Sequence, residues 1–462
     1  MRTTNDPQSL SQVPSKKICL ISLGCPKNLV DAEMMLGFLK KDGFGFTSKP
    51  EEGDVIVVNT CGFVQDSKTE SIDQILEMAK FKESGSCQVL VATGCLSQRY
   101  SKELAEEMPE VDLFVGTGEF DKLSGLLKKK FKKGHAGLNL PQQSLVSNRQ
   151  ILPDPDLPRI LSTPRHYSYI KISEGCSHRC SFCIIPMIRG NLKSRPMESI
   201  VREVEELVAK GVKEFNLVAQ DLNEYGRDLK NGSNLTKLLE KLNKLEGDFW
   251  VRPHYMYPLE FNDRLIGVLR DAEHLVKYVD MPLQHINERI LLSMKRGSPS
   301  RYVRQLLSKL KQEISGLAIR TTFIVGYPGE TEAEFSELYQ FLQEYEFDRV
   351  GIFKYSMEEG TTAAEFPDQI PDEIKEERYH RIMMLQQGIS LKKNRALEGK
   401  VLEVLSEGVS LERPKFYQAR LASQAPEIDG VTFLSGGTPR IGEFRKAKIL
   451  RGAEYDLFAQ LV

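Results

Sequence analysis

Short apolar runs alternate with amphipathic stretches from Lys17 onward, and turns rich in glycine separate most of them. This alternation is typical of βα units built on a parallel sheet. The first series predicts strands over residues 18–23, 54–59, 88–93 and 111–115, with helices after Asn28, Asp66 and Ser97 and from Phe120. We therefore expect an α/β amino-terminal domain with a Rossmann-like parallel sheet over residues 17–133.

A second series of βα units begins at His166. Its strands are predicted over residues 167–172, 214–219, 249–256, 276–281, 319–325 and 349–355, and a helix is predicted over residues 373–395. Six parallel strands with intervening helices favour an open (βα)6 barrel related to the (βα)8 form, which carries its chemistry at the carboxyl ends of the strands. We assign this barrel to residues 165–390.

The pattern changes again near the carboxyl terminus, where short alternating strands such as Lys400–Leu405 predict a small antiparallel β-barrel over residues 391–462. Residues 134–164 are rich in Pro, Ser, Gln and Asn and are interpreted as a linker. Residues 1–16 are polar, lack the apolar core of a secretory signal and are predicted to be a disordered leader. Because these opening residues carry no secretory signal, we expect a cytoplasmic protein. No apolar run is long enough to span a membrane.

The composition narrows the possible functions. The 462 residues are 40% hydrophobic and 27% charged, as in a soluble globular protein, and the formal net charge is −1. A near-neutral chain has no global basic field for indiscriminate binding of nucleic acid. Eight cysteines in a reducing compartment favour metal ligands or catalytic thiols over disulfides.

Three of these cysteines form a C-x3-C-x2-C loop directly after a predicted strand: Cys176, Cys180 and Cys183. Three thiolates so close together can bind three irons of a [4Fe-4S] cluster and leave the fourth iron without a protein ligand. A structural zinc site would require four closed ligands, and the sequence has no second C-x2-C pair to provide them. His178 lies inside the loop and is interpreted as a solvent-facing turn residue, not as a ligand.

A second trio is spread along the amino-terminal domain, with Cys25, Cys61 and Cys95 following three successive strands. The carboxyl ends of parallel strands open onto one edge of a sheet, so these thiols are predicted to converge and to bind a second, auxiliary [4Fe-4S] cluster. Cys19 and Cys87 lie at the starts of strands and are interpreted as small buried hydrophobic residues.

The loop of Cys176 resembles that of the radical S-adenosylmethionine (SAM) superfamily, in which the open iron chelates SAM and an electron cleaves it to a deoxyadenosyl radical. The resemblance implies that Phe182 helps to hold the adenine and that Gln220 and Asp221, after the second barrel strand, contact the amino group of SAM. Gly326, in Gly326-Tyr-Pro-Gly329, is predicted to allow the backbone to approach the adenine. No general acid or base is identified.

Both cysteine trios and nearly the whole chain resemble the methylthiotransferases of that superfamily. Their architecture is an amino-terminal domain with an auxiliary cluster, a radical SAM barrel and a carboxy-terminal TRAM domain. The resemblance implies that one SAM methylates a sulfur species on the auxiliary cluster and that a second SAM generates the radical. The methylthio group then couples to an unactivated carbon of the target.

Known targets in this family are modified adenosines beside the tRNA anticodon and an aspartyl residue of small-subunit ribosomal protein number twelve. Gly24-Cys-Pro-Lys-Asn resembles the ribosomal-protein enzymes, whereas the tRNA enzymes usually have Gly-Cys-Gln-Met-Asn. Asn59-Thr-Cys-Gly-Phe63 and Ala425-Pro-Glu-Ile-Asp-Gly430 agree with that assignment, and Ala32 in place of a more usual Ser is a minor departure. We expect modification of the β-carbon of the aspartate.

Other interpretations remain open at this level. The tRNA target is the main alternative, because the fold and the clusters alone do not separate the two substrates. An iron-sulfur electron carrier is a remote alternative, since a carrier would complete its cluster ligation and would need no barrel. Glu427 and Asp429 either face a basic partner or simply form an acidic turn on the rim of the small barrel. The family further implies a flavodoxin or ferredoxin-type electron donor, and we expect a monomer.

Overall fold

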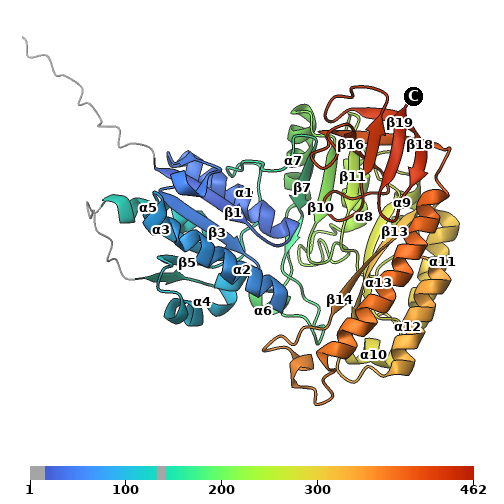
Figure 1. Cartoon of the computed structure of the whole chain (residues 1–462), viewed down its shortest axis with the longest axis horizontal. Coiled ribbons are helices and arrows are strands. Elements are labelled where there is room, and N and C mark those ends of the chain that lie inside the picture. The colour runs from blue at the N-terminus through green and yellow to red at the C-terminus, as the bar shows by residue number, and fades with distance from the viewer. Residues whose placement is uncertain (1–15, 133–141) are drawn as a thin grey trace, which may run out of the picture. The chain divides into compact units, whose positions relative to one another are not determined.

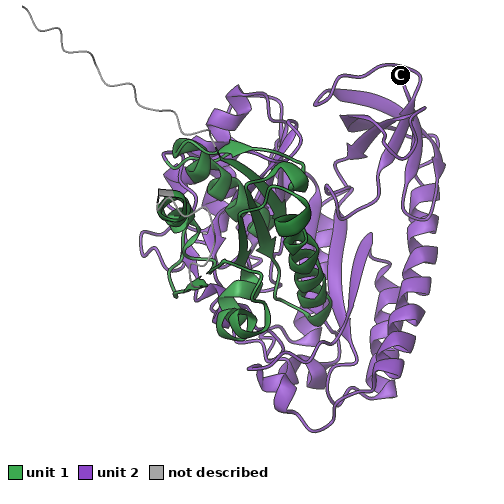
Figure 2. Ribbon diagram, turned by 60° about the vertical axis from the view of Figure 1, so that its left-hand side comes forward, with its two compact units in different colours: residues 1–151, 157–160 green, residues 152–156, 161–462 purple. Residues whose placement is uncertain are grey.

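The computed structural model describes residues 16–132 and 142–462, and these form two compact units (Figure 2). The first unit extends to residue 151 and also includes residues 157–160, whereas the second comprises residues 152–156 and 161–462. The predicted leader, apart from Lys16, lies outside the described residues. No helix in the described ranges is long and apolar enough to cross a membrane.

The first unit is a six-stranded parallel sheet with the strand order β2-β1-β3-β4-β5-β6. Its strands β1, β3 and β5 are labelled in Figure 1. Its strands are β1 (Lys17–Ser22), β2 (Gly45–Phe46), β3 (Val55–Thr60), β4 (Val89–Gly94), β5 (Leu113–Val115) and β6 (Gln143–Leu145). Its helices are α1 (Pro26–Lys41), α2 (Gln65–Ala79), α3 (Phe81–Ser84), α4 (Cys95–Glu107) and α5 (Leu123–Lys132). Helices α1 and α5 contribute to the apolar core on one face, and α2 and α4 contribute to the core on the other.

Two edge strands of this sheet were not predicted. Strand β6 lies inside the predicted linker, and residues 157–160 of that linker also belong to the first unit. The prediction of a linker over the whole of residues 134–164 is therefore wrong. Strands β2 and β6 have only two and three residues, which is too short to show a period of alternating polar and apolar positions.

The barrel of the second unit has the six predicted parallel strands, divided into the sheets β11-β10-β7 and β12-β13-β14. An isolated bridge between Val251 and Leu275 lies where the two sheets adjoin. The strands are β7 (Tyr167–Lys171), β10 (Glu214–Val218), β11 (Trp250–Pro253), β12 (Tyr278–Gln284), β13 (Ala318–Val325) and β14 (Arg349–Lys354). The larger helices are α7 (Met197–Ala209), α8 (Leu235–Leu242), α9 (Asp263–Asp271), α11 (Ser300–Glu313), α12 (Glu332–Tyr345) and α13 (Asp372–Arg395). They enclose a large apolar core between themselves and the strands.

The carboxy-terminal segment forms a closed five-stranded barrel in the order β15-β16-β17-β19-β18. Its strands are β15 (Val401–Val409), β16 (Tyr417–Leu421), β17 (Thr432–Ser435), β18 (Phe444–Gly452) and β19 (Leu457–Leu461). The small β-barrel is confirmed, with one correction, because β17 and β19 pair in parallel and the other pairs are antiparallel.

A buried ionic network joins the small barrel to the amino-terminal ends of the large barrel's strands. Arg420 on β16 donates from Nη2 to Glu214 on β10, and its Nε donates to Glu407 Oε1 at 2.5 Å. Arg252 on β11 donates to Glu214 Oε1 at 2.8 Å. Burial alone would raise the pKa of Glu214, but the two arginines hold that pKa below its usual range. The predicted boundary after residue 390 therefore falls within one compact unit.

The acidic turn between β16 and β17 also belongs to this junction. Glu427 accepts hydrogen bonds from the hydroxyls of Tyr167 and Tyr169, at 2.7 and 3.2 Å, and Asp429 Oδ2 accepts one from Tyr278 at 2.9 Å. These carboxylates bind the large barrel, which corrects the suggestion that they face a basic partner.

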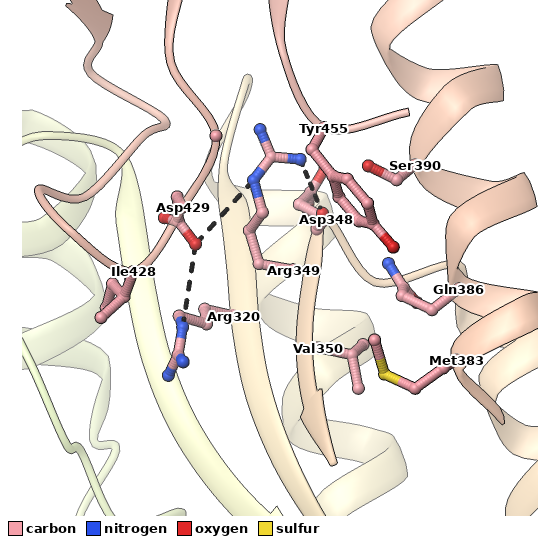
Figure 3. A pocket seen from close by; sticks show the side chains of 11 residues that line it. Arg320, Asp348, Arg349, Val350, Met383, Gln386, Ser390, Ile428, Asp429 and Tyr455 are labelled. Carbon is pink, nitrogen blue, oxygen red and sulfur yellow. Dashed lines mark hydrogen bonds and ion pairs between the residues drawn. The ribbon is translucent and has the colours of Figure 1, made fainter. Parts of the chain in front are cut away.

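A cavity of about 110 Å³ lies beside Asp429 at the same junction (Figure 3). Asp429 Oδ1 is 3.8 Å from Arg320 Nε and 3.9 Å from Arg349 Nε, and Gln386 and Ser390 of α13 line the opposite wall. Arg320 and Arg349 stand near the starts of β13 and β14. The cavity is therefore at the end of the barrel opposite to the carboxyl ends of the strands, where chemistry is expected.

Candidate active site

The loop that contains Cys176, Cys180 and Cys183 follows β7 and the two-residue strand β8 (Ser173–Glu174) at the carboxyl end of the barrel. Cys176 N donates to Gly190 O at 3.0 Å, and Ser181 N donates to Met294 O at 3.1 Å. All three cysteines are free and partly buried. The loop is thus held from both sides, with its thiols at the edge where the barrel strands end.

The protonation of these thiols depends on what they bind. Burial raises the pKa of Cys176 to about 11 and that of Cys183 to about 12. A ligating cysteine must be a thiolate, so metal binding has to displace these protons. Three thiols in one loop match the donor set of a [4Fe-4S] cluster with one open iron.

His178 does not face solvent as predicted. Its Nε2 lies 2.8 Å from Asp221 Oδ2, and its ring stacks on that of Tyr257 with a centroid distance of 4.3 Å. Asp221 Oδ1 accepts from the backbone N–H groups of Asn223 and Tyr257, at 2.9 and 3.2 Å. Both oxygens of Asp221 are therefore occupied in orienting the cysteine loop and the turn after β11, and its contact with SAM stays a prediction.

Gln220 has the stronger geometry for a contact with SAM. Its Nε2 donates to Glu174 Oε1 at 2.9 Å, whereas its Oε1 is buried and has no hydrogen-bond partner among the residues that the structure describes. Lys171 and Arg189 also bind Glu174, and despite its burial they lower the pKa of that carboxyl to about 2. A buried acceptor without a partner is costly, and the ammonium of SAM is a donor that would satisfy it.

The other two predicted SAM contacts differ in how they are placed. Phe182 packs against the apolar cluster that contains Met294 and Tyr327, beside the cysteine loop. Gly326 has a φ of +71°, and a Cβ built there would lie 2.3 Å from Lys375 Cγ of α13. Close packing of α13 thus explains this glycine by itself, and its contact with adenine stays a prediction.

Cys25, Cys61 and Cys95 follow β1, β3 and β4, which are adjacent in the sheet of the first unit. Cys25 is the N-cap of α1, and Cys95 is the first residue of α4. A Cβ built on Gly24 would lie 2.8 Å from Cys61 Cβ and 3.1 Å from Cys61 Sγ. The backbone beside Cys25 therefore touches the side chain of Cys61.

Polar side chains bind these three turns to one another. Asn28 Nδ2 donates to Leu23 O at 2.7 Å, and Asn59 Nδ2 donates to Asn28 O at 2.8 Å. Thr60 Oγ1 donates to Thr93 O at 2.6 Å. Cys61 N donates to Ser71 Oγ at 3.0 Å. Sequence reasoning assigned no role to Asn28, Asn59 or Thr60, although they stand close to the cysteines in the motifs that it used.

Gly24 offers a test of this close approach. If Cys61 binds a second cluster as predicted, the change Gly24→Ala is expected to remove about half of the iron bound per chain, because the added methyl group displaces the Cys61 side chain. The measurement is iron content with the cluster absorbance after anaerobic reconstitution. Gly43→Ala is the matched control, since Gly43 has a similar φ of +90° but an added Cβ there would have no described atom within 4 Å.

Both variants are destabilised by about 1–2 kcal/mol because alanine must adopt the left-handed backbone conformation. Only the contact with Cys61 therefore distinguishes them. Equal iron contents in the two variants would contradict a structural link between Gly24 and the auxiliary site.

Three family models match successive parts of the chain. Residues 17–116 match the Uncharacterized protein family UPF0004, residues 170–342 match the Radical SAM superfamily and residues 399–462 match the TRAM domain. The three matches follow the order and the approximate limits of the sheet, the large barrel and the small barrel.

Curated relatives cover nearly the whole chain. The ribosomal protein uS12 methylthiotransferase RimO of Geotalea uraniireducens (strain Rf4) is 45% identical over 97% of this chain and 98% of its own length. The protein of the same name from Desulforamulus reducens is 48% identical over 96% of this chain and 99% of its own length.

Solved structures show the same kind of fold at low sequence identity. The radical SAM methyltransferase TsrM from Kitasatospora setae, with tryptophan and aza-SAM bound, has a TM-score of 0.50 and 16% identity over 73% of each chain. The apo form of the cobalamin-dependent SAM radical enzyme OxsB has a TM-score of 0.51 and 12% identity over 79% of this chain and 56% of its own. At these identities the likeness concerns the fold alone.

Proposed function

Because this chain belongs to the RimO family of ribosomal protein uS12 methylthiotransferases, we propose that it adds a methylthio group to the β-carbon of an aspartate in uS12, the small-subunit ribosomal protein number twelve. The chain is a radical SAM enzyme that uses SAM and iron-sulfur chemistry. The observation that supports this assignment most directly is the pair of cysteine trios, one following three adjacent parallel strands of the first unit and one in a single loop after β7 and β8 of the barrel.

The proposal includes two [4Fe-4S] clusters, one held by Cys176, Cys180 and Cys183 and one held by Cys25, Cys61 and Cys95. When bound, the clusters would transfer the electron and hold the sulfur species, and SAM would supply the radical and the methyl group that the reaction requires. The two cysteine trios each leave one iron without a protein ligand, for SAM in the barrel and for a sulfur species in the first unit.

The chain's own residues bind SAM and hold the cysteine loop in position. Gln220 accepts a hydrogen bond from the ammonium of SAM at its buried Oε1. Glu174 holds the amide of Gln220 in that orientation. Phe182 contributes an apolar wall beside the cysteine loop. Asp221 and His178 hold the loop against the turn after β11.

The partners in the proposal follow from the chemistry. A low-potential flavodoxin or ferredoxin-type protein supplies the electron, because reduction of SAM requires a potential near the negative end of the iron-sulfur range. The enzyme acts in the cytoplasm as a monomer, on uS12 either free or within the ribosome.

The substrate is tested by mass spectrometry of both uS12 and bulk tRNA, from cells of the source organism with and without this gene. Loss of the methylthio mass from uS12 alone is the expected result. Loss from tRNA alone would overturn the choice of substrate and leave the radical mechanism in place. Unchanged uS12 and tRNA, together with no cleavage of SAM by the reduced protein, would favour an electron carrier.

A further inference from the structure

Six arginines are buried in the part of the chain that the structure describes, and five of them have a carboxylate partner within ion-pair distance. These five are Arg189, Arg195, Arg252, Arg378 and Arg420. The sixth, Arg296, is only 9% exposed and has no carboxylate oxygen within 4.0 Å among the described residues. A buried cation without an anion is costly, so its surroundings indicate what it is meant to bind.

The guanidinium of Arg296 is directed at the cysteine loop of the barrel. Its Nη1 lies 3.8 Å from Cys180 Sγ, and its Nη2 donates to Pro282 O at 2.6 Å. Its central carbon lies 3.8 Å from the centroid of the Tyr257 ring. The next residue is also held, because Gly297 N donates to the hydroxyl of Tyr257 at 2.8 Å.

Backbone hydrogen bonds of the turn that contains Arg296 fix this orientation. Arg296 lies in the turn after α10 (Glu288–Ser293), where its own N–H donates to Leu291 O at 2.9 Å. The same turn contributes Met294 O, which accepts from Ser181 N in the cysteine loop. The arginine and the loop are therefore parts of one hydrogen-bonded assembly.

We propose that Arg296 is a positioning residue for the barrel cluster, in which its charge and its N–H group directed at Cys180 Sγ make the cluster easier to reduce. A cluster with three thiolate ligands supplies the anion that Arg296 lacks. Hydrogen bonds to the sulfurs and nearby charge are established controls of cluster potential, and a fixed cation stabilises the more negative, reduced state.

The step concerned is the one-electron reduction of the [4Fe-4S] cluster from the 2+ to the 1+ state. The electron comes from a low-potential one-electron donor, which is oxidised by one electron, and no bond or proton is transferred. The inference rests on the proposed function only in that Cys176, Cys180 and Cys183 hold such a cluster.

The test is an anaerobic redox titration of the full chain, followed by the EPR signal of the reduced cluster and with dithionite as reductant. Cys25, Cys61 and Cys95 are all replaced by alanine in every sample, so only the barrel cluster contributes. In this background Arg296→Gln is expected to lower the equilibrium constant for reduction about tenfold, which is a shift of about 59 mV to a more negative potential.

Two further variants make the test specific. Arg289→Gln removes an exposed arginine from α10 whose partners are Glu334 and Gly329 O, and it should leave the potential unchanged. Arg296→Lys keeps a positive charge at the site and should restore most of the potential lost in Arg296→Gln.

Every outcome bears on the inference. An unchanged potential in Arg296→Gln would overturn it. If Arg296→Gln binds no cluster, the lysine variant decides. In that case, a lysine variant whose cluster has nearly the original potential would support the role of charge. A lysine variant without a cluster, or with a potential lowered by about 59 mV or more, would overturn it. None of these readings uses uS12, so failure of this inference is separate from failure of the proposed substrate.

Discussion

Replacement of Cys25, Cys61 and Cys95 by alanine is expected to abolish methylthio transfer while reductive cleavage of SAM to 5′-deoxyadenosine continues. The three thiols lie on a separate compact unit from the barrel loop, so their loss leaves the SAM site intact. Loss of a residue that only supports a metal ligand typically costs about 10- to 100-fold. Loss of the ligands themselves should therefore reduce methylthio transfer by more than about 100-fold.

The measurement is parallel chromatography of deoxyadenosine and mass spectrometry of the uS12 product from one reaction. The matched controls are Cys19→Ala and Cys87→Ala, which remove buried thiols of the same unit that follow no strand end and should retain both activities. Cys180→Ala should lose both activities together. Methylthio transfer by the triple variant at the original rate would contradict a role for the auxiliary cluster.

Strand-end reasoning predicted the convergence of Cys25, Cys61 and Cys95 because it depends only on chain direction in a parallel sheet. Contact between Gly24 and the side chain of Cys61 agrees with that expectation. The same reasoning does not predict the contact of Arg296 with Cys180. Arg296 lies in a turn after a short helix, 116 residues away from Cys180 in the sequence. A single sequence has no periodic signal for such a pair.

The contact between the small barrel and the large barrel could not be predicted from the sequence for a related reason. Arg420 and Glu214 are 206 residues apart, and each lies in a strand whose pattern indicates only that one of its faces is buried. The opposite error occurred at the acidic turn. The sequence suggested that Glu427 is exposed, whereas in the structure its carboxylate binds the hydroxyls of two tyrosines. The local sequence pattern predicted the helices and strands. The partners of the buried charges can be identified only once the arrangement of those elements in space is known.

Replacement of Arg420 by methionine is expected to destabilise the second unit by about 3–5 kcal/mol. Arg420 is 1% exposed and is held between Glu214 and Glu407, so its removal leaves two buried carboxylates with one fewer cation. With its present partners, Glu407 has a pKa of about 2 in spite of its burial. Its charged form therefore depends on Arg420 together with His166 and Gln418, which also bind it.

The single tryptophan of the chain reports on this junction. Trp250 is at the start of β11, and its ring lies 4.9 Å from that of Phe444 on β18. Urea unfolding of the full chain, followed by Trp250 fluorescence, should therefore show an earlier transition in Arg420→Met. Arg445→Met is the matched control, because the exposed pair of Arg445 with Glu443 should contribute less than about 1 kcal/mol.

Equal shifts in the two variants would mean that the buried network does not hold the small barrel in place. A further arm separates charge from packing. Because Glu407→Gln removes one of the two stranded carboxylates, adding it to Arg420→Met should recover part of the lost stability. No recovery would assign the loss to the packing of the arginine side chain instead of its charge.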